Sequence, residues 1–198
     1  MALAILHHTD FMRESAYLTN HFLIAMPQLL DPNFFHTVTY ICEHNSQGAM
    51  GIVINQPVEL TLGEVADHLG FPASDGQHLE QTIFRGGPVE TERGFVLHKP
   101  IGTWDSTLSV TDSIGLSTSN DIVAALARGE GPSKCLVALG YAGWGAGQLE
   151  QEMVENSWLS GPADERILFE TSTEDRWEAA AALVGIDIHN ISGDVGHA

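Results

Sequence analysis

The sequence predicts a single α+β domain, and three observations support that class. The chain has 198 residues, an ordinary length for one domain. Its 43% hydrophobic and 17% charged residues are typical of a globular protein. Segments with strand patterns cluster early in the chain and do not alternate regularly with helical ones, which favours α+β over a doubly wound parallel sheet.

The first part of the chain is expected to form a buried strand followed by a β-hairpin. Phe22 to Met26 is a continuous apolar run before a proline, which is typical of a buried strand. Residues 36–44 then alternate between two faces, and Asn45 to Gly48 supplies turn residues before a returning apolar run. Residues 36–55 are therefore predicted to form a β-hairpin.

Four helices are expected from capping residues and apolar periodicity. Thr61 and Glu64 form a capping-box pattern, and Gly70 ends that helix. The other three are predicted at about residues 119–128, 146–156 and 173–184. Further short strands are predicted at residues 83–84, 94–98, 107–117, 135–139 and 166–169.

Residues 1–17 are expected to be a loosely attached N-terminal extension, and residues 18–198 the single folded domain. Met1 to Leu6 is apolar but lacks the preceding positive charge of a secretory signal. No apolar run approaches the roughly 20 residues that span a bilayer. We therefore expect no membrane partner.

The charge balance argues against nucleic acid as a direct partner. Eight Lys and Arg residues oppose 26 Asp and Glu residues, for a net charge of −18. The cations are scattered and no two are adjacent, whereas binding a phosphate backbone requires several on one face. The simplest interpretation of the charge is that it maintains solubility.

The cysteines and histidines give no metal or catalytic pattern. Cys42 and Cys135 each lie in an apolar run, which indicates buried thiols in a reducing cytoplasm. The ten histidines contain no HExxH motif, and His36 and His44 would lie about 26 Å apart on a straight strand. No nucleophile elbow or cysteine-enzyme motif is present. We expect no metal and no cofactor.

The most informative stretch runs from Gly140 to Glu150. It is predicted to lead from a strand through a glycine-rich loop into a helix, which is the arrangement that presents backbone N–H groups to an anion. The dinucleotide spacing fails because Gln148 stands where the third glycine would fall, and no Gly-Lys-Ser/Thr follows. Glu150, Glu152 and Glu155 would also repel a phosphate.

Two interpretations of this stretch remain. It is either a tight crossover packed under Tyr141 and Trp144, or a site for a small molecule or a peptide. On the following helix, Gln148, Glu152 and Asn156 have i, i+4, i+8 spacing and form one polar row. That row is either a solvated face or a binding surface.

A second glycine-dependent turn is Arg85-Gly86-Gly87-Pro88. Arg85 is a candidate for a contact with a carboxylate or a phosphate. The alternative is a bend between two β segments with an exposed arginine.

Eight collinear segments stand out from about residue 18 to the end of the chain. They are Asn20 to Pro27, Tyr40 to His44, Gly48 to Asn55, Gly86 to Val89, Gly94 to His98, Gly140 to Trp144 with Gly147 to Glu150, Asn156 to Leu159, and Gly196 to Ala198. Together they resemble one known family, the bacterial AlgH/YqgE proteins. This resemblance implies a cytoplasmic bacterial protein with coiled, partly split mixed β-sheets. It implies no reaction, cofactor or catalytic residue, although some members carry the label of transcriptional regulator.

The leading hypothesis is a non-enzymatic binding protein that acts through an unknown protein partner or a small ligand. One alternative is a hydrolase-type enzyme that uses Glu43, His98, Glu150 or Glu152 as acid–base groups. Another is a regulator that contacts DNA directly, which the net charge disfavours. The candidate binding residues are Arg85, Gly86, Gly87, Pro88, His98, Gly143, Trp144, Gly145, Gly147, Gln148, Glu150, Glu152 and Asn156.

Overall fold

The computed structural model describes residues 17–191 and confirms the α+β class. Its strands form one curled mixed sheet in the order β10-β1-β2-β3-β9-β6-β8-β7, and β4 joins it through β5, which pairs with β9. The strands are β1 His21–Ala25, β2 Val38–Asn45, β3 Gly48–Val53, β4 Pro57–Thr61, β5 Thr82–Arg85, β6 Val89–Lys99, β7 Thr107–Ser109, β8 Gly115–Ser117, β9 Lys134–Gly145 and β10 Trp158–Pro162. The helices are α2 Leu62–His68, α3 Asn120–Ala127, α4 Gln148–Val154, α5 Glu165–Phe169, α6 Arg176–Leu183 and α7 Ile188–Ile191, with 3₁₀ turns at Gln77–Glu80 and Thr173–Asp175.

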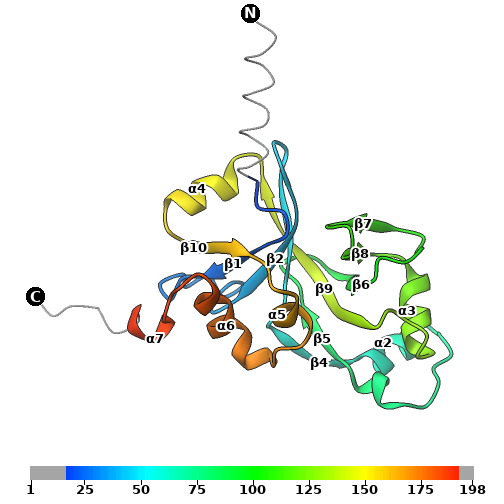
Figure 1. Ribbon diagram of the computed structural model, residues 1–198. Helices are drawn as coiled ribbons and strands as arrows, with labels where there is room; N and C mark the ends of the chain where they lie inside the picture. Colours follow the sequence, from blue (N-terminus) through cyan, green and yellow to red (C-terminus); the bar gives the residue numbers. More distant parts are fainter. Residues whose placement is uncertain (1–16, 192–198) are drawn as a thin grey trace, which may run out of the picture.

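Strand β9 joins the two halves of the sheet (Figure 1). Its first part pairs antiparallel with β6 over Lys134 to Tyr141, and in parallel with β5 over Val137 to Leu139. Its last four residues pair instead with β3. One half of the molecule therefore carries β1, β2, β10 and α4, and the other carries β5 to β8 with α2 and α3.

Two local predictions are confirmed in detail. Strands β2 and β3 form the expected hairpin, with Asn45 paired to Gly48. At the start of α2, the Thr61 hydroxyl accepts a hydrogen bond from the Glu64 backbone N–H at 3.3 Å. The Glu64 carboxylate accepts one from the Thr61 N–H at 2.8 Å, which completes the capping box.

The predicted glycine loop is mostly a strand, because β9 continues as far as Gly145 before it turns into α4. Pairing with β3 supplies the hydrogen bonds that a loop would lack. The strands approach so closely there that a β-carbon on Gly48 would lie 2.1 Å from the Trp144 carbonyl oxygen. Within the segment itself, Gly140 is held by a close approach, since a β-carbon there would lie 2.5 Å from the Gly87 carbonyl oxygen.

The strand expected at residues 166–169 is wrong. The segment is the short helix α5, because the Asp164 carboxylate caps it by accepting the Arg166 backbone N–H at 2.8 Å. The last strand is instead β10, which pairs antiparallel with β1 from Trp158 to Pro162. Short helices α5 and α7 add to the four that were predicted.

Three apolar clusters make up the core of the described residues. The largest lies between the two halves of the sheet and includes Tyr40 and Leu97, with Leu168 and Ala180 from α5 and α6. A second cluster lies beneath α4. The third lies beneath α2 and α3.

The N-terminal extension expected at residues 1–17 lies outside the described residues, apart from Tyr17, whose ring is 5.0 Å from that of His44. The closing Gly196 to Ala198 segment lies outside them too. None of the helices described is both long enough and apolar enough to cross a bilayer. Cys42 and Cys135 are free thiols on β2 and β9. Cys42 is buried as expected, whereas Cys135 is only partly buried.

Candidate functional site

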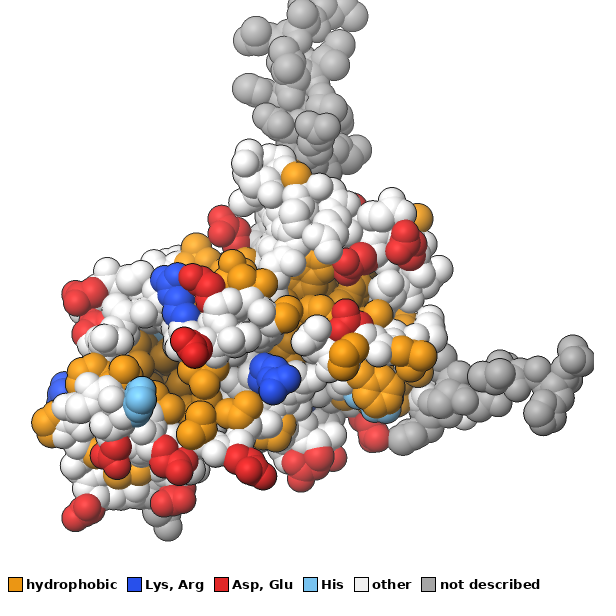
Figure 2. Space-filling model, turned by 180° about the vertical axis from the view of Figure 1, so that it is seen from behind, with side chains coloured by type: hydrophobic (Ala, Val, Ile, Leu, Met, Phe, Trp, Pro, Cys, Tyr) orange, Lys and Arg blue, Asp and Glu red, His pale blue; other side chains and the backbone are white. Residues whose placement is uncertain are grey.

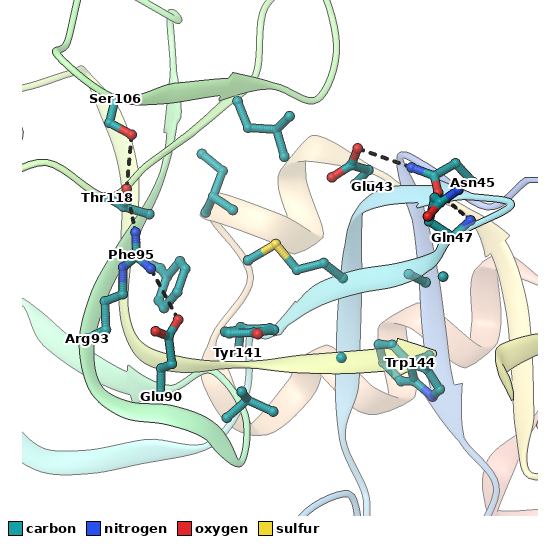
Figure 3. Close-up of a pocket in the computed structure, with 17 residues that line it drawn as sticks. Glu43, Asn45, Gln47, Glu90, Arg93, Phe95, Ser106, Thr118, Tyr141 and Trp144 are labelled. Atoms are coloured by element: carbon teal, nitrogen blue, oxygen red, sulfur yellow. Dashed lines mark hydrogen bonds and ion pairs between the residues drawn. The ribbon is translucent and has the colours of Figure 1, made fainter. Parts of the chain in front are cut away.

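A groove of about 680 Å³ opens between the β2–β3 hairpin and the strands β6 to β8 (Figure 3). We call it the inter-sheet groove, because it is the solvent-facing mouth of the cluster between the two halves of the sheet. It is lined by Glu43, Asn45, Gln47, Gly48, Ala49, Met50, Val89, Glu90, Arg93, Phe95, Ser106, Leu108, Leu116, Thr118, Tyr141, Gly143 and Trp144.

The floor of the inter-sheet groove is apolar. Met50, Leu108 and Tyr141 are partly buried and pack against the main core cluster, to which Phe95 and Leu116 belong. The Phe95 and Tyr141 rings meet edge to face, with centroids 5.5 Å apart. Strand alternation places these five side chains on the inner faces of β3, β6, β7, β8 and β9.

The two rims of the groove carry polar side chains that face each other across it (Figure 3). On the hairpin rim, the exposed Glu43 carboxylate accepts a hydrogen bond from the Asn45 amide at 3.2 Å. On the opposite rim, Arg93 pairs with the Glu90 carboxylate at 3.2 Å and donates to the Thr118 hydroxyl at 3.4 Å. The Arg93 guanidinium also lies 5.5 Å from the centre of the Phe95 ring.

The two predicted glycine turns lie against each other beside this groove. A β-carbon on Gly87 would lie 2.1 Å from the Tyr141 carbonyl carbon, and one on Gly86 would lie 2.2 Å from the Gly140 oxygen. Gly86 donates its N–H to Leu139 and accepts from Val53, each at 2.8 Å, where the partner of β9 changes from β5 to β3. The Arg85–Pro88 segment thus holds the two halves of the sheet together, and Arg85 is exposed.

The predicted polar row on α4 is largely satisfied internally. The Glu152 carboxylate accepts the indole N–H groups of Trp144 at 2.9 Å and Trp158 at 2.8 Å, together with the Gln148 amide at 3.0 Å. Gln148 also caps the turn by accepting the Gly145 N–H at 3.0 Å. Trp144 is only 6% exposed and belongs to the cluster beneath α4, as the packed-crossover interpretation requires.

The remaining candidates in and around α4 lie in different surroundings. Gly147 adopts a left-handed conformation with φ of 77° and starts the helix, and Asn156 is exposed beyond its end with φ of 56°. The Glu150 carboxylate contacts the buried His44 ring at 3.0 Å, while the other nitrogen of that ring accepts the Leu18 N–H. His44 therefore donates to Glu150 in its neutral form.

His98 is fully buried and lies away from the other candidates, since it pairs with Cys135 near the start of β9. Its Nδ1 atom is 2.9 Å from the Pro100 carbonyl oxygen, and its Nε2 atom is 2.8 Å from the buried Ser117 hydroxyl. Desolvation by burial lowers the pKa of His98, although its contact with the Pro100 carbonyl opposes that change. The neutral ring thus completes a hydrogen-bond chain that substrate could not reach.

The described residues give little support to acid–base catalysis. Glu43, Glu150 and Glu152 lie on separate elements or faces, and the ring nitrogens of His98 are bonded to groups other than a carboxylate. Within residues 17–191, no three His, Cys, Asp or Glu side chains group as metal ligands would.

Of the residues that line the groove, Glu43, Gly143 and Trp144 are candidates from the sequence, and Tyr141 is expected there only as a packing residue. Met50, Leu108 and Tyr141 fit strand patterns that also describe an ordinary core, so their opening to solvent has no local signal. Arg93 precedes a glycine in a charged stretch, and nothing in that stretch indicates that its guanidinium lies over the Phe95 ring at the edge of the groove. The groove arises from pairing between strands that are distant in sequence.

Comparison with known proteins gives consistent matches over nearly the whole chain. A family model described as AlgH-like matches residues 22–189. A UPF0301 protein from Thioalkalivibrio sulfidiphilus is 60% identical over 187 residues, covering 94% of this chain and 100% of the relative. A UPF0301 protein from Nitrosococcus oceani is 54% identical over the same shares.

Two solved structures share the fold. The solution structure of the AlgH protein from Pseudomonas aeruginosa is 50% identical, with a TM-score of 0.76 over 92% of this chain and 97% of that one. The crystal structure of the protein DIP2367 from Corynebacterium diphtheriae has a TM-score of 0.69 over 88% of this chain and 91% of that one. At 18% identity, its likeness concerns the fold alone.

Proposed function

This chain belongs to the AlgH-like family, and we propose that it is a non-enzymatic binding protein that holds a segment of a protein partner in the inter-sheet groove. The observation that carries this proposal is the apolar floor left open at the mouth of the main core. Apolar floors with polar rims are typical of surfaces that bind other molecules. The occupant would complete the core by contributing its own apolar side chains.

Charge complementarity selects the chemistry of the partner. The groove carries Glu43 and Glu90 against one cation, Arg93, and that cation is already paired with Glu90. The whole chain has a net charge of −18, which attracts cationic partners and repels anionic ones. The proposed partner segment therefore carries apolar residues flanked by Lys or Arg.

This proposal fits the described chemistry better than the alternatives. A hydrolase needs a base that substrate can reach, whereas His98 is buried and both of its ring nitrogens are bonded to groups other than a carboxylate. Direct DNA binding needs a basic face, which eight scattered cations do not provide. Any regulatory effect would then act through the partner. We also propose a cytoplasmic location, in which the free thiols of Cys42 and Cys135 would stay reduced.

Selection from a random peptide library on the purified chain tests the proposal. We expect the bound peptides to combine apolar and basic residues. Leu108→Asp in the floor and Glu43→Lys on the rim should each weaken the selected peptides by about tenfold or more, since each removes complementarity. Val154→Asp on α4 is the matched control, because Val154 is 76% exposed and lies outside the groove.

The two groove variants differ in their risk of unfolding. Leu108 is partly buried, so the folding of the Leu108→Asp chain is checked by circular dichroism. Glu43 is exposed, so reversing its charge in Glu43→Lys should leave the fold unchanged. Peptides that bind both variants as tightly as the unmodified chain would show that the inter-sheet groove is not their site. Enrichment of acidic peptides would contradict the charge argument.

A further inference from the structure

A second pocket, of about 770 Å³, lies between α2, α3 and the outer face of β6 and β9. We call it the helical pocket. It is a hollow in the apolar cluster beneath α2 and α3, on the opposite face of β6 from the floor of the inter-sheet groove. It is lined by Leu60, Glu64, Val65, His68, Leu69, Thr91, Glu92, Arg93, Gly94, Val96, Ser117, Thr118, Ser119, Asn120, Val123, Val137 and Leu139.

Gly94, which lines this pocket, is unusual among the glycines that the structure describes. Some of them have positive φ, and at the others a β-carbon would meet a neighbouring atom within 4 Å. Gly94 has neither property, since its φ lies outside the left-handed range and its β-carbon would meet nothing. Neither backbone conformation nor close packing requires glycine at this position, and what the missing side chain provides is open space in the helical pocket.

The walls of the pocket are apolar. Val65 and Leu69 come from α2, Val123 from α3, and Val96 and Val137 from the sheet. Figure 2 shows hydrophobic side chains gathered on the half of the molecule that carries α2 and α3, with few Lys and Arg side chains near them. A pocket of this volume and lining matches the sites that proteins use for small molecules.

The polar groups at the pocket favour an uncharged ligand. Glu64 and Glu92 are carboxylates, and Glu64 is held in its capping box. Arg93 is the one Lys or Arg among the described residues that line the pocket, and its guanidinium already contacts Glu90 and Thr118. An anionic head group would meet repulsion, whereas the side chains of Asn120 on α3 and His68 on α2 offer hydrogen-bonding groups.

We propose that the helical pocket binds a small, uncharged, apolar molecule with a hydrogen-bonding group at one end. The site is separate from the inter-sheet groove, which holds a protein segment. Arg93 and Thr118 line both and form the ridge between them. The two sites can therefore be tested independently.

Titration with the uncharged fluorophore N-phenyl-1-naphthylamine tests this inference. We expect saturable binding with enhanced emission. The Gly94→Ala, Gly94→Val and Gly94→Phe series should weaken binding progressively as the side chain fills the space, with Ala within about threefold of the unmodified chain and Phe abolishing saturation. Gly145→Phe is the matched control, because a β-carbon there meets only the Gln148 side-chain oxygen at 3.9 Å and lies outside both pockets.

Two further variants keep the test decisive if Gly94→Phe does not fold. Leu69 is 42% exposed at the mouth of the helical pocket, so Leu69→Asp should preserve the fold and weaken the probe by about tenfold or more. Leu108→Asp, in the other groove, should leave probe binding unchanged. The inference is overturned if the unmodified chain shows no saturable binding, if Leu69→Asp binds normally, or if Leu108→Asp alone abolishes binding.

Discussion

The carboxylate of Glu152 is expected to be a structural group whose removal destabilises the fold. It accepts two indole N–H groups, from Trp144 and Trp158, which are 6% and 4% exposed. In Glu152→Ala both donors lose their acceptor in surroundings from which water is largely excluded. Each unsatisfied buried donor costs about 1–3 kcal/mol, so the free energy of unfolding should fall by about 2–6 kcal/mol.

A conservative variant separates hydrogen bonding from charge. In Glu152→Gln the amide oxygen can still accept both indole N–H groups, but the acceptor is no longer charged, and we expect a loss of about 1–2 kcal/mol. Glu155→Ala on the same helix is the control. Glu155 is exposed and its carboxylate accepts the Gln151 amide at 2.7 Å, so its removal should cost within about 0.5 kcal/mol.

Urea unfolding followed by far-ultraviolet circular dichroism measures these differences in the free energy of unfolding. Tryptophan fluorescence is avoided because the substitutions change the surroundings of Trp144 and Trp158. The expected order of stability is unmodified chain, Glu155→Ala, Glu152→Gln and Glu152→Ala. If Glu152→Ala were as stable as Glu155→Ala, the carboxylate would not be holding the two indoles. Glu152 would then return to the set of surface candidates.

Three further outcomes follow from the same structure. Gly87→Ala should prevent folding or cost more than about 3 kcal/mol, because its β-carbon would lie 2.1 Å from Tyr141, whereas Gly94→Ala should change thermal stability little. Burial lowers the pKa of His98, so as the pH falls the unfolded chain takes up the proton before the folded one does. The free energy of unfolding therefore keeps its full value above the unfolded pKa of 6.5 and declines as the pH falls below it. This group contributes a slope of at most about 1.4 kcal/mol per pH unit. The urea midpoint of His98→Gln should fall less steeply between pH 7 and pH 5, and equal slopes would contradict this. Burial also raises the pKa of the Cys42 thiol, so iodoacetamide at pH 8 should modify Cys42 only after urea is added, as peptide mass spectrometry would show.

The features predicted correctly from sequence are those that neighbouring residues determine. The hairpin follows from alternation on both sides of Asn45 to Gly48, and α2 from the Thr61–Glu64 pair, since each pattern contains its own hydrogen-bond partners. The strand predicted at residues 166–169 is wrong because a short apolar run fits a strand or a buried helix equally well. Only the side chain of Asp164 decides between them.

The groove and the pocket depend on contacts between distant residues. Ala142 to Gly145 belongs to a strand because β3 lies alongside, some ninety positions earlier in the chain. Glu152 was predicted to lie on a polar row, yet its bonding to Trp158 requires β10 to return beneath α4. The inter-sheet groove lies between strands that are distant in sequence, and the helical pocket lies between two helices and the sheet. The sequence could therefore indicate individual residues but not the two openings.

The shared strand β9 also has a consequence for the order of assembly. It pairs with β3, β5 and β6, all of which precede it in the chain, by more than thirty residues in each case. Neither half of the sheet can close until this late segment has been synthesised and inserted. Such long-range pairing favours slow folding and a single cooperative transition. A break in the connection between β6 and β7 would therefore yield two fragments that fold only together.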